Sequence, residues 1–142
     1  MFNYDRSKVE IGFLHFGLGG FHRAHQAVFL DKAIENGNLG LGIASISQKD
    51  PSLADEMKAA NSIYEVEASD GVRTERRMIG SIKESLFYSR DEKRILKIAR
   101  SPKLKAITLT VTEKAYKSDS EFIQRLAKVL RERYESGGGS IA

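Results

Sequence analysis

Residues 11–25 constrain the fold of this chain more than any other stretch. They begin with an apolar run over 11–16, which ends at the turn Gly17-Leu18-Gly19-Gly20 and is followed directly by a helical pattern. A short continuous apolar run is typical of a buried parallel strand. A glycine turn between such a strand and a helix leaves backbone N–H groups without partners at the helix start, where an anion can bind. The stretch therefore predicts a strand, an anion-binding turn and a helix.

The rest of the chain continues the alternation of strands and helices. The first helix is expected over 20–36, because Asn36-Gly37 is a typical helix end. Strands that alternate with helices form parallel sheets with right-handed crossovers, so we predict an α/β fold with a doubly wound, mostly parallel sheet. The other expected elements are a strand over 41–47, a helix from Pro51, a helix over 91–99, a strand over 104–111 and an amphipathic helix over 121–134.

Residues 62–88 are expected to interrupt this parallel pattern. The segment 63–68 alternates apolar and polar side chains, as a half-exposed strand does, and Asp70-Gly71 is a strong hairpin signal. Strand-like runs continue to Phe87 and are broken at Gly80. We therefore predict an antiparallel excursion over 62–88 on the parallel core.

Composition favours a single globular domain. The chain has 142 residues, of which 41% are hydrophobic and 30% charged, and it contains no cysteine. The lack of cysteine excludes disulfides and thiolate metal sites and fits the cytoplasmic location that we expect. No apolar run is long enough to span a membrane, and the polar N-terminus does not resemble a signal peptide. The net charge is +4, but acids are interspersed with the basic residues, so we predict solvated helix faces and no nucleic-acid partner.

The glycines match a dinucleotide-binding motif in part. Gly17 and Gly19 occupy the first two positions of Gly-x-Gly-x-x-Gly, but His22 stands at the third, and Gly20 comes one residue after the second. Glycine turns also join strands to helices for purely structural reasons. The glycines alone therefore leave both interpretations open.

The side chains after the glycines favour a bound anion. His22, Arg23 and His25 lie in the first turns of the expected helix, and no acid follows before Asp31. Cations at a helix N-terminus oppose the helix dipole, and a bound phosphate reverses the sign of that interaction. The alternative is that these side chains point to water or pair with acids elsewhere. We predict that the turn binds the pyrophosphate of a dinucleotide.

The histidines offer a weaker alternative, a metal site. His22 and His25 have i,i+3 spacing, but no Cys, Asp or Glu lies next to them to complete a ligand set. His15 falls in the apolar strand, where a buried histidine with satisfied hydrogen bonds is the simpler interpretation. We predict no metal.

Asp50 has two plausible roles at the end of the second strand. An acid at this position binds the adenosine ribose in dinucleotide-binding domains. Asp50-Pro51 also suits a helix N-cap followed by proline at the first helical position, and this interpretation is slightly favoured. Lys49 would tolerate a 2′-phosphate. NAD is therefore the expected cofactor, and NADP stays open.

Polar residues also follow the strand expected over 104–111. Thr112, Glu113, Lys114 and Tyr116 come at its carboxyl end, which faces the ligand cleft of a doubly wound sheet. A solvated loop explains the same residues equally well.

Four segments together resemble the long-chain mannitol dehydrogenase family, which includes polyol dehydrogenases and hexuronate reductases. The longest is Gly-Leu-Gly-Gly-Phe-His-Arg-Ala-His-Gln-Ala-Val-Phe at 17–29. The others are Tyr-Asp-Arg-Ser-Lys-Val at 4–9, Met-Ile-Gly-Ser-Ile at 78–82 and Leu-Thr-Val-Thr-Glu-Lys-Ala-Tyr at 109–116. They occur in the family's order and cover most of the chain.

This resemblance implies a Rossmann-like domain of a nicotinamide-dependent oxidoreductase that interconverts a polyol or sugar acid and its keto form. It also implies that the glycine turn and the residues after the strand expected over 104–111 contact the cofactor. Two features after that strand differ from the family: Ala115 replaces the usual glycine, and the segment 117–121 is shorter than in many relatives. The complete set of expected cofactor-binding residues is Gly17, Leu18, Gly19, Gly20, Phe21, Arg23, Asp50, Thr112 and Glu113.

The resemblance also limits what residues 1–142 can do. Members of that family are several hundred residues long, and their catalytic lysine, with asparagine and histidine partners, lies in a C-terminal helical domain. We therefore expect a truncated cofactor-binding domain that is inactive alone, with no catalytic residue, in which Lys114 does not take the lysine's role. The substrate would bind through the missing domain, and the chain would self-associate through an exposed sheet edge or apolar face. The alternative is a non-catalytic nucleotide-binding or protein-interaction module.

Overall fold

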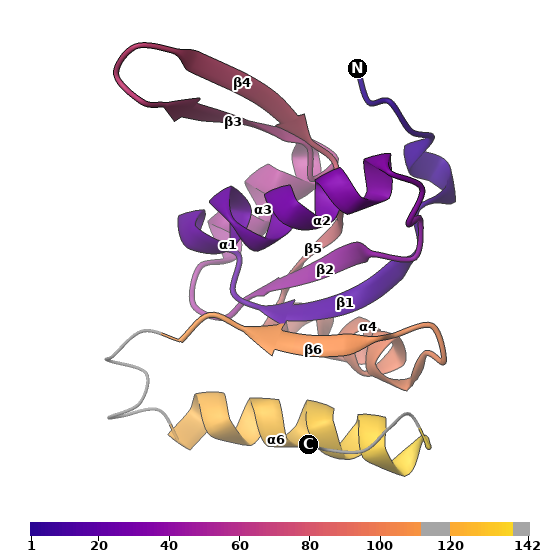
Figure 1. The fold of residues 1–142 in the computed structure, drawn as a ribbon. Coiled ribbons are helices and arrows are strands. Elements are labelled where there is room, and N and C mark those ends of the chain that lie inside the picture. Colours follow the sequence, from indigo (N-terminus) through magenta and orange to yellow (C-terminus); the bar gives the residue numbers. More distant parts are fainter. Residues whose placement is uncertain (112–119, 138–142) are drawn as a thin grey trace.

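The centre of the protein is a four-stranded parallel sheet with the strand order β5-β2-β1-β6 (Figure 1). The computed structural model describes residues 1–111 and 120–137. This arrangement confirms the predicted α/β fold with a mostly parallel sheet. The strands are β1 (Ile11–Phe16), β2 (Gly42–Ser47), β5 (Ile82–Phe87) and β6 (Ala106–Leu109).

Helices cover both faces of the sheet (Figure 1). The helices α1 (Gly20–Ala24), α2 (Gln26–Glu35) and α3 (Pro51–Ala59) lie on one face, and α4 (Tyr88–Arg100) and α6 (Ser120–Glu135) lie on the other. A short 3-10 helix, η1 (Arg6–Lys8), precedes β1. No helix in the described ranges is both long enough and apolar enough to cross a membrane.

The two central strands are apolar because both of their faces pack against helices. All six residues of β2 are buried, and Leu14 and Phe16 of β1 have no exposed surface. Leu14 lies between Ala44 of β2 and Ile107 of β6 in the parallel register. This double coverage explains why β1 and β2 have continuous apolar sequences.

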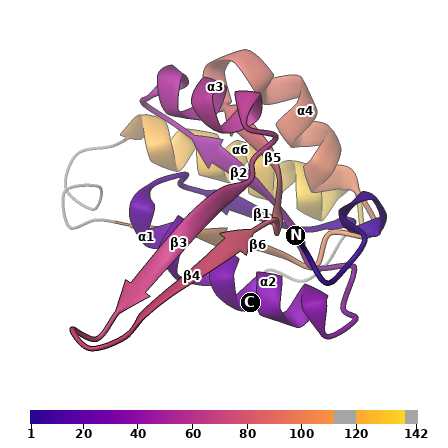
Figure 2. The same cartoon turned by 90° about the horizontal axis from the view of Figure 1, so that it is seen from above.

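An antiparallel hairpin projects from the main sheet (Figures 1 and 2). It consists of β3 (Tyr64–Ser69) and β4 (Thr74–Ile79), which pair from Tyr64 with Ile79 to Ser69 with Thr74. Asp70 shapes the loop, since its Oδ1 accepts hydrogen bonds from the backbone N–H groups of Val72 (2.9 Å) and Arg73 (2.7 Å). The predicted excursion is therefore correct over the hairpin.

The prediction was wrong for the second part of 62–88. Strand β5 does not extend the hairpin but pairs in parallel with β2, for example Ser85 with Ser45. Ile82 and Ser85 are buried, as expected of a strand within a covered parallel sheet. Gly80 therefore separates the hairpin from the core strand instead of breaking one continuous excursion.

The helices also differ from their expected bounds. The single helix expected over 20–36 is broken at His25, whose φ of −119° and ψ of −83° are not helical, so α1 has only five residues. α4 begins at Tyr88 and contains a kink at Asp91. β6 is shorter than the expected 104–111, whereas α3 and α6 match their predictions closely.

Two charged side chains fix the base of the hairpin. The Arg6 guanidinium donates hydrogen bonds to the backbone oxygens of Gly80 (2.9 Å), Asn61 (2.9 Å) and Ile82 (2.7 Å). The buried carboxylate of Asp31 on α2 accepts hydrogen bonds from the Gly80 N–H, the Tyr4 hydroxyl and the Arg77 guanidinium. The lead-in to β1, the helix α2 and both ends of the hairpin are thereby held together.

Candidate functional site

Gly17 makes the sharp turn at the end of β1. Its φ is +131°, a backbone angle that residues with a Cβ rarely adopt. A Cβ built on Gly17 would lie 3.2 Å from Nε2 of His15 and 3.4 Å from Cβ of Thr110. The backbone conformation strains any residue with a Cβ, and His15 would also have to shift slightly to accommodate one, so the first glycine of the motif has a structural reason for its identity.

A cleft of about 350 Å³ opens above this turn. It lies at the carboxyl ends of β1, β2 and β6, three neighbouring parallel strands, where doubly wound sheets bind their ligands. The first turns of α6 close its other side. The lining residues are Gly17, Leu18, Gly19, Ser47, Gln48, Lys49, Asp50, Leu53, Thr110, Glu121, Phe122 and Arg125.

The backbone of the turn is open to a ligand. A Cβ built on Gly19 or on Gly20 would meet no atom within 4 Å. Gly19 is the N-cap of α1 and has a φ of −69°, so the lack of a side chain there does not reflect a strained backbone. An absent side chain with open space above it allows a bulky anion to approach the backbone closely. The residues present therefore fit the pyrophosphate of a dinucleotide.

Asp50 caps α3 from the rim of the cleft. Its Oδ1 accepts hydrogen bonds from the backbone N–H groups of Ser52 (3.0 Å) and Leu53 (3.3 Å). The hydrogen bonds from Ser52 and Leu53 lower the pKa of Asp50 below its usual value. The favoured interpretation as an N-cap is confirmed. Contact with a ribose stays a prediction, because Asp50 also lines the cleft.

Two basic residues lie at the β2 side of the cleft, Lys49 and Arg125. The Arg125 guanidinium donates to the backbone oxygen of Gln48 (3.3 Å) and to Oε1 of Glu121 (2.6 Å). It also lies 4.9 Å from the centre of the Tyr88 ring. Arg125 was not among the residues expected from the sequence. Its available signal was a basic residue between Phe122 and Val129, which are both buried on the same helix.

The structure separates two expected site residues from the cleft. Phe21 is 68% exposed, and its ring centre lies 4.4 Å from that of His25. Arg23 points toward α3 and the hairpin, where its Nη1 lies 3.9 Å from Sδ of Met57 and its guanidinium carbon 5.8 Å from the centre of the Tyr64 ring. Neither residue lines the cleft. The sequence suggested that Arg23 forms one cluster with the glycine turn, but in the structure it does not.

The residues expected after the last core strand lie outside the described ranges. Thr112 and Glu113, with Lys114 and Tyr116, belong to this group. Thr110 is the last residue of that region seen at the cleft, and sequence analysis did not include it. It was overlooked because a threonine near the end of a strand is ordinary in composition.

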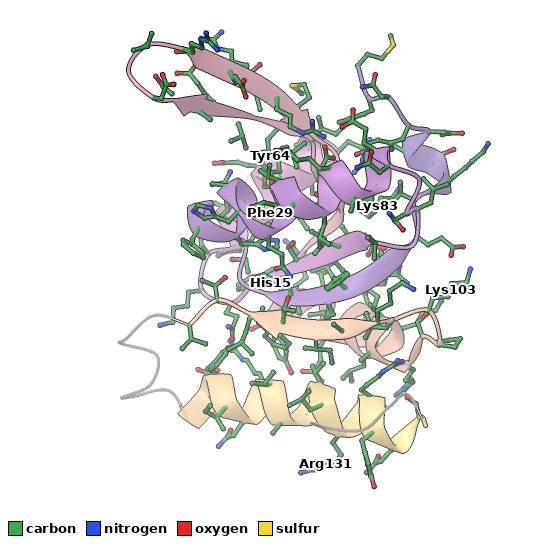
Figure 3. The ribbon with its side chains drawn as sticks, in the orientation of Figure 1. His15, Phe29, Tyr64, Lys83, Lys103 and Arg131 are labelled. Atoms are coloured by element: carbon green, nitrogen blue, oxygen red, sulfur yellow. The ribbon has the colours of Figure 1, made fainter. Side chains whose placement is uncertain are left out.

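His15 and His22 form a stacked pair directly behind the glycine turn. Their ring centres are 3.7 Å apart and the ring planes differ by 9°. His15 lies on the face of β1 that α1 and α2 cover (Figure 3). Its ring nitrogens contact Oγ1 of Thr108 (2.7 Å) and Oγ1 of Thr110 (2.9 Å). The interpretation of His15 as a buried histidine with satisfied hydrogen bonds is confirmed.

His22 is also buried, with 2% of its surface exposed. Its Nδ1 contacts Oε1 of Gln26 (3.1 Å) and its Nε2 contacts Oγ of Ser45 (2.8 Å). The anion hypothesis had placed His22 as a cation at the helix start, and this part was wrong, because the ring faces the sheet and is neutral. Metal ligation by His22 and His25 has no support either, since both His22 nitrogens already have hydrogen-bond partners.

Burial keeps both rings neutral at physiological pH. It lowers the pKa of His15 to about 3, and the neighbouring His22 contributes to the shift. The pKa of His22 falls to about 4, mainly through burial, although the hydrogen bond to Gln26 opposes the shift. Two charged rings at stacking distance would repel each other in a site with little water. A neutral pair therefore supports the turn.

Comparison with known proteins agrees with this geometry. Residues 11–140 match the family model described as the mannitol dehydrogenase Rossmann domain. The chain is 34% identical over 122 residues to the D-mannonate oxidoreductase of Escherichia coli, a match that covers 83% of the chain and 25% of that protein. It is 31% identical over 120 residues to a mannitol 2-dehydrogenase of Pyricularia oryzae, with 80% of the chain and 23% of that protein covered.

A solved structure shows the same fold over nearly the whole chain. The ternary complex of Pseudomonas fluorescens mannitol 2-dehydrogenase with NAD and D-mannitol superposes with a TM-score of 0.83 at 26% sequence identity. The superposition covers 98% of this chain and 34% of that one. The chain thus spans about a quarter of the length of the curated relatives it matches. The family match over residues 11–140 includes the glycine turn and all residues that line the cleft. The chain therefore belongs to the mannitol dehydrogenase family and corresponds to its Rossmann domain.

Proposed function

We propose that this chain binds NAD through the cleft above the glycine turn and serves as the cofactor-binding domain of an oxidoreductase. The observation that carries the proposal is the open turn at Gly19 and Gly20, located where three parallel strands end. The Pseudomonas fluorescens relative in complex with NAD supports the identity of the cofactor. We retain Gly17, Leu18, Gly19 and Asp50, which line the cleft, as cofactor-binding residues. We also retain Gly20, which does not line the cleft but follows Gly19 directly and has an equally open Cβ position.

Each part of the cleft contributes a different interaction. The glycine turn provides close backbone approach to the pyrophosphate. Lys49 lies at the β2 side, where the adenosine end of a dinucleotide lies in a doubly wound sheet, and Arg125 lies there as the partner of Glu121. The bound nicotinamide would supply hydride transfer, and the protein's task at this site is to bind and orient it.

The relatives support a proposal for the substrate class. A mannitol 2-dehydrogenase and a D-mannonate oxidoreductase are similar to this chain to nearly the same degree. We therefore propose a polyol or a sugar acid as the substrate, interconverted with its keto form. The cleft contains no described histidine or lysine arrangement for abstracting a hydroxyl proton. We propose that those groups come from a further region of such an enzyme, and that residues 1–142 alone do not turn over substrate.

A fluorescence titration with NADH and NADPH tests the cofactor assignment. The decisive variant is Gly19→Val, because Gly19 has an ordinary φ and open space at its Cβ position, so valine fits the fold but blocks the ligand. Ala68→Val, the matched control, changes an exposed strand residue of the hairpin. We expect saturable binding by the wild type and Ala68→Val and its loss in Gly19→Val. Absence of binding by the wild type, or equal binding by Gly19→Val, would overturn the proposal.

The same titration decides between NAD and NADP. Lys49 lies at the end of β2, where it can approach a 2′-phosphate, whereas the carboxylate of Asp50 is engaged at the start of α3. If Lys49 contacts a 2′-phosphate, Lys49→Ala weakens NADPH more than NADH. If Lys49→Ala weakens NADH and NADPH equally, Lys49 does not contact the 2′-phosphate, and this result favours NAD.

A further inference from the structure

We propose that a chain of polar side chains behind the glycine turn makes Thr110 a hydrogen-bond donor to a phosphate oxygen of the dinucleotide. This inference rests on the proposed function, since it concerns the same cleft. Thr110 lines the cleft, and its Oγ1 lies 3.5 Å from the position of a Cβ built on Gly17. This series of hydrogen-bonded side chains runs from Ser45 through His22, Gln26, Thr108 and His15 to Thr110.

The atom that carries each proton follows from the buried end of this series of side chains, Ser45. Ser45 is fully buried on β2, and its hydroxyl contacts Nε2 of His22 at 2.8 Å, its side chain's one contact of this kind among the described residues. The hydroxyl proton must therefore go to Nε2 of His22, because otherwise it would be buried without an acceptor. His22 then carries its own proton on Nδ1 and donates it to Oε1 of Gln26, 3.1 Å away.

The next links carry the same direction forward. With its oxygen turned to His22, Gln26 donates from Nε2 to Oγ1 of Thr108 at 3.1 Å. The Thr108 hydroxyl has two acceptors, Nδ1 of His15 at 2.7 Å and Oε1 of Gln26 at 3.3 Å. The shorter contact has the normal length for a strong hydrogen bond, so it takes the proton.

The last link fixes the state of Thr110. Since Nδ1 of His15 accepts from Thr108, the ring proton lies on Nε2 and is donated to Oγ1 of Thr110, 2.9 Å away. Thr110 thus accepts from His15 and retains its own hydroxyl proton for a group in the cleft. A donor beside a glycine turn suits an anion, whereas the reverse order would direct an oxygen lone pair at a phosphate. A protonated His15 would donate to both threonines and would change the link to Thr108, but Thr110 would still accept from Nε2 and keep its own proton.

The tautomers of the two rings provide a test that does not depend on turnover. We expect His22 as the Nδ1–H tautomer and His15 as the Nε2–H tautomer, resolved by ¹H–¹⁵N correlation NMR of the ring nitrogens in the full chain. The chain has three histidines, and His25→Gln removes the signals of the third. The opposite tautomer at His15 would make Thr110 a donor to the ring and would overturn the inference.

Binding measurements test the contact itself. Thr110→Val removes the hydroxyl at nearly constant shape, whereas Thr110→Ser keeps it. We expect Thr110→Val to weaken NADH binding about tenfold or more, as for a lost hydrogen bond to a charged group, and Thr110→Ser to stay close to the wild type. Thr74→Val, at an exposed position on β4, is the matched control with unchanged affinity.

Calorimetry with ADP-ribose locates the contact on the phosphates. This ligand keeps the pyrophosphate and lacks the nicotinamide, so Thr110→Val weakens it by the same factor as NADH. A loss confined to NADH, or equal binding of NADH by Thr110→Val and the wild type, would overturn the Thr110 contact and leave the proposed function intact. If the wild type binds neither NADH nor NADPH, the proposed function falls and the Thr110 contact falls with it.

Discussion

Arg77 of the hairpin forms an ion pair with Asp31 of α2, with 2.7 Å between Nη2 and Oδ2. The Asp31 carboxylate is buried and also accepts hydrogen bonds from the Tyr4 hydroxyl (2.6 Å) and the Gly80 N–H (2.9 Å). Burial and the neighbouring Asp31 raise the pKa of Tyr4 above its ordinary range, so this hydroxyl is protonated and donates at neutral pH. One carboxylate thus connects three segments that are distant in sequence.

We predict that Asp31→Ala lowers the free energy of unfolding by about 3 kcal/mol, because it leaves the Tyr4 hydroxyl and the Gly80 N–H without their acceptor and removes one of the two carboxylates that pair with Arg77. Urea unfolding measures the change. Glu35→Ala is the control: Glu35 pairs with the same guanidinium at 2.8 Å but is partly exposed, so its loss is expected to cost clearly less stability than the loss of Asp31. Equal effects of the two variants would contradict the central role of Asp31.

The stacked histidines make stability depend on pH in a defined window. Both rings have pKa values below that of an unfolded histidine, about 3 for His15 and about 4 for His22, so the unfolded chain binds more protons as the pH falls below 6.5. Stability is therefore fully present above pH 6.5 and declines by up to ~1.4 kcal/mol per pH unit for each ring as the pH falls toward 4.

The interval between pH 6.5 and 5 isolates the histidines, because carboxylates with lowered pKa values, such as Asp50 and Glu35, stay ionised there. Urea midpoints across this interval measure the slope, and NMR titration identifies the rings. Midpoints that do not change between pH 6.5 and 5, or a ring of His15 or His22 that titrates near 6.5 in the folded chain, would show that the pair is not held neutral.

Replacing Gly17 affects stability and binding together. We predict that Gly17→Ala lowers the free energy of unfolding by about 1–3 kcal/mol, because its backbone conformation is strained for alanine, and that the crowded Cβ also displaces His15 or Thr110. Gly37→Ala separates the two effects, since Gly37 has a φ of +99° but no neighbour within 4 Å of its Cβ position. Thermal unfolding and NADH titration check both variants. Gly37→Ala is expected to lose stability only, and unchanged NADH affinity in Gly17→Ala would contradict the role of Gly17 in the site.

Self-association is expected through the outer edge of β6. Within the described residues β6 is an edge strand, and it presents Leu109 with 39% of its surface exposed. Unpaired edges of this kind attract a further strand. Sedimentation at increasing concentration is expected to show association that Leu109→Lys reduces, and a wild-type monomer at all concentrations would refute it.

Local sequence rules accounted for most of the fold. The apolar runs of β1 and β2, the Asp50 cap and the Asp70-Gly71 hairpin each follow from interactions within a few residues, and all four are present. β5 was assigned to the hairpin because a half-polar sequence does not reveal which strand it pairs with. Its place next to β2 depends on burial of Ile82 and Ser85 by distant helices.

The site was harder to predict because its supporting residues act at long range. The spacing of His22 and Arg23 from the glycines suggested cations around an anion, but in α1 His22 faces Ser45 and Arg23 faces Met57. Thr110 meets Gly17 only because β6 lies next to β1 in the sheet. Such neighbours cannot be derived from a motif of consecutive residues.

The hairpin loop offers a practical point of access to this protein. Arg6 and Asp31 fix the base of the hairpin, whereas residues 70–73 at its tip are all exposed. Exposed loop tips of this kind accept inserted sequence with little effect on the rest of a domain. A fluorophore or an affinity peptide placed there would report on the molecule from a position separate from the cleft, without altering the termini.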